Sequence, residues 1–171
     1  MRLSKTVLAL AAVTLLASCG AKDITKAQAV EMAKGYDTAN VVYKSGDGKL
    51  VSKATFSDNV PAEIREGYKD GEQTQHFEGS EIVENRVSAA VIEAIPEDAA
   101  KFKANGKALE FTYTEAQEVL GQKVNHETYA KTDDNGYVVE SKTTMNLEMA
   151  VSESEVYKIT VVATVTFTWT K

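Results

Sequence analysis

The segment YKITVVATVTFTWT, residues 157–170, decides the fold. Its odd-numbered positions are all apolar, and its even-numbered positions are mostly threonine. Because successive side chains of a strand point to opposite faces, this period of two predicts a strand with one buried face and one largely polar face. At ~3.3 Å per residue the strand spans roughly 40 Å, which exceeds the usual length.

The sequence before this segment continues the same pattern. Residues 145–151 alternate between apolar and polar side chains, with Met145 and Met149 on the apolar side. Farther upstream, Asp133-Asp134-Asn135-Gly136 predicts a tight turn between strands near 125–132 and from Tyr137 onward. The C-terminal third therefore predicts an antiparallel meander of long, curved strands.

Helix signals dominate the sequence before the meander. Thr25 is a predicted N-cap for a helix that ends at Gly35, and Pro61 opens a short helix through about Lys69. Residues 82–95 have mostly helical spacing, although their many Val and Ile residues leave a strand open for part of the stretch. Thr114 with Gln117 resembles a capping box, which predicts one more short helix over 114–121.

One hairpin is expected near the N-terminus. Ser45-Gly46-Asp47-Gly48 has the composition of a hairpin turn between strands at about 38–44 and 49–57. The short helices are the available cover for the apolar face of the sheet. The predicted fold class is therefore α+β: a long, curved antiparallel sheet, in the form of an incomplete barrel, with short helices on one face.

Composition describes one ordinary globular domain. The 171 residues are 43% hydrophobic and 26% charged, with 10 Gly, 2 Pro and a single Cys. These values disfavour a disordered chain and a disulfide-stapled scaffold. The net charge of −6 disfavours a nucleic-acid binder that relies on phosphate neutralisation, so no nucleic-acid partner is expected.

The N-terminus has the layout of an export signal. Arg2 and Lys5 precede an almost uninterrupted apolar run over 6–16, which ends in Leu16-Ala17-Ser18-Cys19. The run is about half the roughly 20 residues that a membrane-spanning helix needs. The alternative left open is a signal peptide with an incidental cysteine.

Leu16-Ala17-Ser18-Cys19 resembles the lipobox of bacterial lipoproteins. The resemblance implies cleavage before Cys19, a diacylglyceryl group on its thiol and acylation of the new amine. It divides the chain into a signal peptide (1–18), an acylated N-terminus with a short tether (19–23) and one domain (24–171). Gly20, where an Asp would resemble an inner-membrane retention signal, favours the outer membrane in a two-membrane bacterium; in a single-membrane bacterium the protein would lie on the outer face of the cell membrane.

The mature chain is more acidic than the precursor. Removal of residues 1–18 takes away Arg2 and Lys5 and no acid, which changes the net charge from −6 to −8. An anionic domain is not attracted to anionic lipid by its own surface. Several acyl chains hold a protein firmly at a bilayer, so the anchor on Cys19 is the expected membrane contact.

The order of elements resembles the LolA-like superfamily, which includes lipid-handling lipoproteins of the LppX and LprG type. The resemblance covers most of residues 24–170 and is one of pattern, without a diagnostic motif. It implies an incomplete barrel around an apolar cavity that binds acyl chains, and it transfers no binding residue.

Catalysis, metal binding and cofactors are not expected. His76 and His126 have no partner at a metal-ligand spacing. Aligning Gly136 with the glycine of a calcium loop places Lys131 first and Lys142 twelfth, where acids are required. The protein is therefore expected not to be an enzyme.

Apolar strand residues are the candidate ligand site. Flexible methionines and aromatic rings line adaptable lipid pockets, although they fill protein cores more often. The candidates are Met145, Met149, Val165, Phe167 and Trp169. Two hypotheses remain: a lipoprotein that binds a lipid or another hydrophobic ligand, and a structural or interaction lipoprotein with a filled core and a protein partner.

Overall fold

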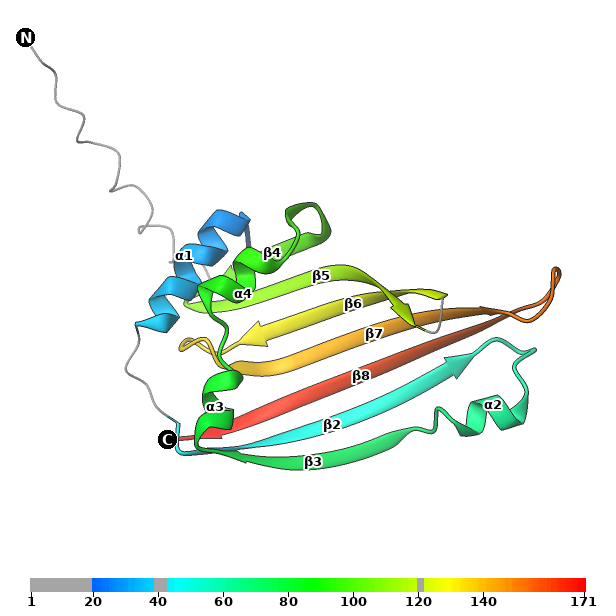
Figure 1. Cartoon of the computed structure of the whole chain (residues 1–171). Coiled ribbons are helices and arrows are strands. Elements are labelled where there is room, and N and C mark those ends of the chain that lie inside the picture. The colour runs from blue at the N-terminus through cyan, green and yellow to red at the C-terminus, as the bar shows by residue number, and fades with distance from the viewer. Residues whose placement is uncertain (1–19, 39–42, 120–121) are drawn as a thin grey trace, which may run out of the picture.

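The computed structural model describes residues 20–38, 43–119 and 122–171 (Figure 1). Within these residues, eight antiparallel strands form one curved sheet in the order β1-β4-β5-β6-β7-β8-β2-β3, with β1 and β3 at its edges. The strands are β1 (Lys22–Ile24), β2 (Ser45–Phe56), β3 (Gly71–Glu78), β4 (Ala100–Asn105), β5 (Ala108–Val119), β6 (Gln122–Thr132), β7 (Val138–Ala150) and β8 (Val156–Thr170). The predicted α+β class with a long, curved antiparallel sheet is confirmed.

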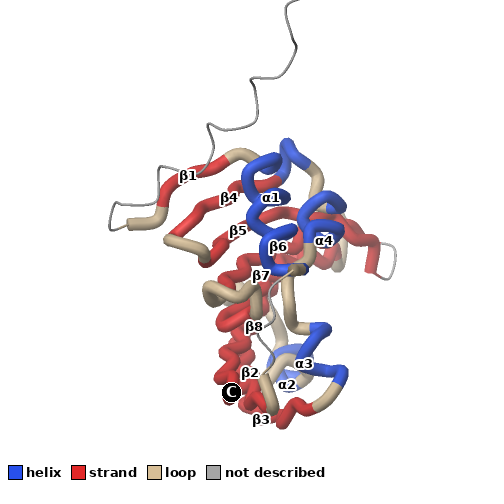
Figure 2. The backbone as a smooth tube through the Cα atoms, turned by 90° about the vertical axis from the view of Figure 1, so that its left-hand side faces the viewer, coloured by secondary structure: helices blue, strands red, loops and turns tan. Residues whose placement is uncertain are grey.

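In the described part of the chain, four short α-helices accompany the sheet. They are α1 (Lys26–Asp37), α2 (Ala62–Glu66), α3 (Ser80–Glu84) and α4 (Ala89–Ala94), followed by a 3-10 turn, η1 (Glu97–Ala99). All of them lie on one face of the sheet, as Figure 2 shows. We call this helix-bearing side the inner face and the opposite side the outer face.

The C-terminal meander matches its sequence pattern. β8 has 15 residues and pairs with β7 on one side and β2 on the other. The turn between β6 and β7 is also as predicted: Gly136 has φ +85°, and the amide of Asp133 donates to the carbonyl of Tyr137 over 2.8 Å. The alternation of side chains and the turn chemistry are local signals, and the structure follows both.

The capping prediction for α1 is confirmed. The amide of Gln28 donates to Thr25 Oγ1, and the amide of Thr25 donates to Gln28 Oε1 over 2.9 Å. These reciprocal bonds satisfy amides that a helix start otherwise leaves unpaired. The helix continues through Gly35 to Asp37, and Lys22 and Asp23, expected in the tether, pair with β4 as β1.

The hairpin turn predicted at Ser45–Gly48 is wrong. These residues begin β2, which runs unbroken to Phe56. Both glycines are there because large rings lie over them: a Cβ on Gly46 would meet Trp169 at 2.2 Å, and one on Gly48 would meet Phe77 at 2.7 Å. Of the strand expected at 38–44, residues 39–42 lie outside the described residues, and the described residues on either side are not in a strand.

The helix predicted over 114–121 is also wrong. β5 continues to Val119 and pairs with β6 from Glu110↔Lys131 to Val119↔Gln122. Pairing with a long neighbouring strand outweighs a local capping signal, because strand formation depends on tertiary context. The helical spacing at 82–95 becomes two helices, α3 and α4, joined by a segment in which Arg86 bridges to Tyr137.

The main core lies between two helices and one end of the sheet. α1 packs against α4 and β4. Ala29, Ala33 and Ile92 are fully buried there against Leu109 and Phe111 of β5. Figure 1 shows α1, α3 and α4 gathered over the end of the sheet where β8 finishes, whereas α2 lies at the opposite end.

Candidate functional site

One end of the inner face is closed by an aromatic cluster. The indole Nε1 of Trp169 donates to the carbonyl of Val138 over 2.8 Å, and its ring stacks on Phe167 with centroids 5.5 Å apart. α3 covers the cluster with Ile82, which is 3% exposed. The cluster comprises Tyr43, Phe77, Tyr137, Phe167 and Trp169.

Polar bonds anchor this cluster to the β6–β7 turn. The hydroxyl of Tyr43 donates to a carboxylate oxygen of Asp133, and Asn135 Nδ2 donates to the same hydroxyl over 3.3 Å. Burial raises the pKa of Tyr43, and donation to the Asp133 carboxylate raises that pKa further. The Tyr43 hydroxyl therefore stays protonated and holds the cluster in place.

The opposite end of the inner face is closed by residues around α2. Phe56 pairs with the buried Ile159 and contacts the ring of Tyr68 edge-on, with centroids 6.4 Å apart. Val60 is 4% exposed, and the guanidinium of Arg65 lies over the Phe56 ring. Arg65 also donates to the carbonyl of Val60 over 2.8 Å, which fixes the loop before α2.

Between these ends lies an apolar strip that we call the trough. Its side chains belong to β2, β7 and β8, share the inner face by register and are half-buried. They are Leu50, Ala54, Met145, Leu147, Val161, Ala163 and Val165. Figure 1 shows no labelled helix over this middle part of the sheet. The trough is thus an apolar surface closed at both ends and incompletely covered by the described chain.

A groove adjoins the trough at the α4 end. It has a volume of about 440 Å³. Its sheet side includes Phe111, Tyr113, Ala130, Val138 and Ser141, and its helix side includes Val87, Val91, Ala94 and Ile95. Ala130 pairs with Ser141, and Ser141 pairs with Val165 of the trough. The groove and the trough therefore form one continuous, mainly apolar surface.

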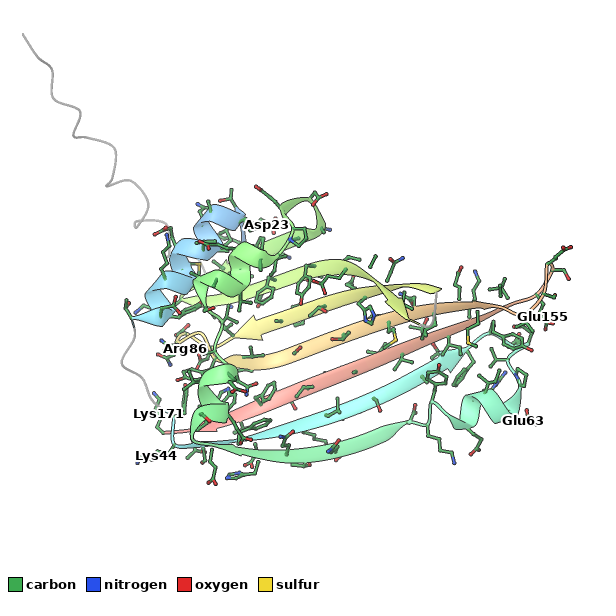
Figure 3. The ribbon with its side chains drawn as sticks, in the orientation of Figure 1. Asp23, Lys44, Glu63, Arg86, Glu155 and Lys171 are labelled. Carbon is green, nitrogen blue, oxygen red and sulfur yellow. The ribbon has the colours of Figure 1, made fainter. Side chains whose placement is uncertain are left out.

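Polar groups mark the margins of this surface. Glu84, Asn85 and Arg86 line the mouth of the groove. Arg86 Nε donates to the carbonyl of Asn135 over 3.2 Å, and the guanidinium lies over the Tyr137 ring, so its position is fixed (Figure 3). On the sheet, His126 lies between Glu115 and Met145 by register, and its Nε2 is buried with no protein partner in the described part of the chain.

A second depression lies at the β1 and β4 edge. Its volume is about 600 Å³, and its lining includes Asp23, Lys26, Glu97, Lys101 and Lys103. Five of the nine residues that line it are charged, and burying these side chains against an apolar ligand would remove their hydration at a cost. This depression is therefore a poorer apolar site than the groove.

The five residues predicted to bind ligand share the inner face but play different parts. Met145 and Val165 belong to the trough, and Met149 pairs with Tyr157 near the β7–β8 hairpin end. Phe167 and Trp169 belong to the aromatic cluster and are occupied in packing. The groove residues on β5 and α4 had no signal in the sequence, because their proximity depends on how α4 packs over the sheet. Cys19 lies outside the described residues.

Comparison with protein families, with characterised proteins and with solved structures finds no match for this chain. The site is therefore interpreted from its own geometry.

We also searched the described residues for metal sites, hydrogen-bonded histidines and membrane-spanning helices. No group of three or more His, Cys, Asp or Glu side chains there could hold a metal ion. His76 Nδ1 lies 2.9 Å from an Asp47 carboxylate oxygen, and this hydrogen bond raises the pKa of His76 on the exposed outer face. None of the helices in residues 20–38, 43–119 and 122–171 is long and apolar enough to span a membrane.

Proposed function

We propose that this protein is a lipid-anchored protein of the bacterial cell envelope that holds an elongated apolar ligand, an acyl chain or a lipid, along the trough and groove. The observation that carries the proposal is the continuity of the two surfaces through Ser141 and Val165. A ligand lying there would cover half-buried apolar side chains that the described chain leaves incompletely covered.

The dimensions suit an acyl chain. From Leu147, which pairs with Ile159, to Val165 the trough extends over six residues of β8, or roughly 20 Å, because a strand rises ~3.3 Å per residue. This is longer than one leaflet of a hydrocarbon core that is about 30 Å thick. Burial of about ten methylenes contributes about 8 kcal/mol, the scale of a micromolar dissociation constant before ordering costs are subtracted.

The chemistry of the surface favours an amphiphile over a plain hydrocarbon. A buried polar atom without a partner costs about 1–3 kcal/mol, and His126 Nε2 is such an atom at the edge of the trough. The polar group of an amphiphile would supply a partner at His126 or at the groove mouth beside Arg86. The methionines Met145 and Met149 add side chains that adapt to different chain shapes.

Location supports the same proposal. The lipobox resemblance implies acyl chains on Cys19, and α1 begins shortly after, at Lys26. A domain tethered this closely would meet lipids at the bilayer surface. The resemblance to LolA-like lipid-handling lipoproteins, which rests on the order of elements, implies the same class of ligand. The proposed protein binds and carries its ligand without catalysis and needs no cofactor.

Filling the groove tests the proposal. Ala94→Trp places a large ring in the groove from the exposed side of α4, and we expect it to reduce uptake of a fluorescent fatty acid by about tenfold. The matched control is Ala90→Trp, on the same helix at an exposed position outside the groove lining, which should bind like the wild type. Titrations of residues 20–171 with the probe measure both affinities. Equal affinities for the two variants would place the ligand elsewhere.

A further inference from the structure

The free edge at β3 carries an inference beyond the proposed ligand site. β3 pairs with β2 on one side only, and seven of its eight residues are exposed. Figure 1 shows no described segment alongside its outer edge. A long open edge presents backbone donors and acceptors to any extended partner.

The register shows which backbone groups face this edge. The last residue pair between β2 and β8 is Phe56↔Ile159, so Ser57 and Lys158 are the next pair in register. The amide of Ser57 donates to the carbonyl of Lys158 over 3.0 Å, which shows that odd-numbered β2 residues turn their backbone groups to β8. Backbone groups in an antiparallel strand point alternately to its two neighbours. Even-numbered β2 residues therefore face β3, and the β3 residues that turn their backbone groups to the open edge are Glu72, Thr74 and His76.

This edge is self-complementary around Thr74. Consider a two-fold axis that joins two copies into one sheet with both inner faces on the same side. Even-numbered residues of one β3 must then lie opposite even-numbered residues of the other, and odd opposite odd, so that one residue lies opposite its own copy at the axis. With Thr74 opposite its own copy, Gln73 faces Gln75 and Glu72 faces His76 of the second copy. A shift that centres Gln75 instead would set Glu72 against Glu78, a like-charge pair within both β3 strands, whereas the Thr74 register sets Glu78 only against Asp70, which precedes β3.

The charges near the axis reinforce this register. Glu72 forms an ion pair with Lys49 over 2.8 Å, and His76 pairs with Asp47 over 2.9 Å. Joining two edges would bring each Glu72–Lys49 pair beside a His76–Asp47 pair, so charges of opposite sign alternate across the axis. We propose that two copies of this chain associate through antiparallel β3 edges centred on Thr74, with about six backbone hydrogen bonds between them.

Proline at the centre tests the edge itself. Residues 20–171 contain every described helix and strand, so this length of chain is used for light scattering coupled to size exclusion. The wild type is expected at twice the monomer mass. Thr74→Pro removes an amide that faces the open edge, which an edge strand tolerates, and should give a monomer with unchanged circular dichroism and thermal midpoint. A monomeric wild type at all concentrations, or a dimeric Thr74→Pro, would overturn the proposal.

Charge reversal tests the register. Glu72→Lys sets a lysine opposite His76, so at a mildly acidic pH, where His76 is protonated, like charges face each other and the dimer dissociation constant should rise by about tenfold or more. Adding His76→Glu restores an opposite pair and should recover dimerisation. Glu153→Lys makes the same charge change in the exposed turn between β7 and β8, away from β3, and serves as the matched control, which should stay dimeric. Loss of the dimer in the control with retention in Glu72→Lys would refute this register.

A cysteine pair gives a direct distance test. Residues 20–171 contain no cysteine, so Thr74→Cys introduces one at the axis. Residues opposite each other in an antiparallel pair have Cα atoms about 5.5 Å apart or closer, which a disulfide spans. Thr74→Cys should form a disulfide-linked, reducible dimer in a glutathione buffer. Gln73→Cys should form much less disulfide-linked dimer, because Gln73 lies opposite Gln75 and not opposite its own copy. Equal cross-linking at the two positions would contradict the symmetric register.

Discussion

Replacing Gly136 by alanine is expected to destabilise the domain by about 3–4 kcal/mol. Gly136 has φ +85°, a conformation that costs an L-residue about 1–2 kcal/mol. The added Cβ would also lie 2.4 Å from the ring of Tyr36, and overpacking costs about 1–3 kcal/mol more. Tyr36 is 4% exposed and donates its hydroxyl to the carbonyl of Lys107, so it has little room to move.

Gly35→Ala is the matched control for this substitution. Gly35 lies inside α1, and a Cβ there would meet nothing within 4 Å. Alanine in a helix is favoured over glycine by about 0.5–1 kcal/mol, so this variant should be more stable than the wild type. Urea unfolding of residues 20–171 measures both changes as shifts of the midpoint at constant slope. A loss below about 1 kcal/mol in Gly136→Ala would contradict the packing described for the turn.

Replacing Cys19 by serine in the full-length precursor is expected to move the protein out of the membrane fraction. Serine cannot form the thioether to diacylglycerol, and the domain has no other acyl anchor in this proposal. In the proposed protein, two or three acyl chains supply the membrane affinity, because an anionic domain is not attracted to anionic lipid. The loss should therefore be nearly complete.

Fractionation and intact mass together measure this result. Wild-type protein should sediment with membranes and carry the added mass of its acyl groups. Ser18→Ala keeps the cysteine and a small residue before it, so it should behave like the wild type. If Cys19→Ser kept both the membrane fractionation and the mass of the wild type, Cys19 would not be an acylation site.

The sequence predicted those parts of the fold that depend on local chemistry. The alternation in β8, the turn at Asp133–Gly136 and the Thr25 N-cap all reappear in the structure. β3 was missed because its sequence, GEQTQHFE, is polar on both faces and lacks the alternation of a half-buried strand. Such a pattern belongs to an edge strand exposed on both sides.

Errors arose where distant contacts decide local structure. Gly46 and Gly48 suggested a turn, yet they are small because Trp169 and Phe77 lie above them, and β3 and β8 flank β2. The capping signal at Thr114 predicted a helix, but this segment pairs with β6 as part of β5. Of the predicted site, Met145 and Val165 fell in the trough, whereas the groove residues depend on the position of α4.

The central claim is that the trough and groove hold a lipid, and native mass spectrometry of residues 20–171 tests it most directly. The protein would be purified without detergent from a bacterial host. We predict a reproducible adduct of lipid mass that is lost on denaturation and is reduced in Ala94→Trp but kept in Ala90→Trp. A clean apo mass for the wild type, with no uptake when fatty acids and phospholipids are offered, would contradict the claim and favour an interaction lipoprotein with a filled core.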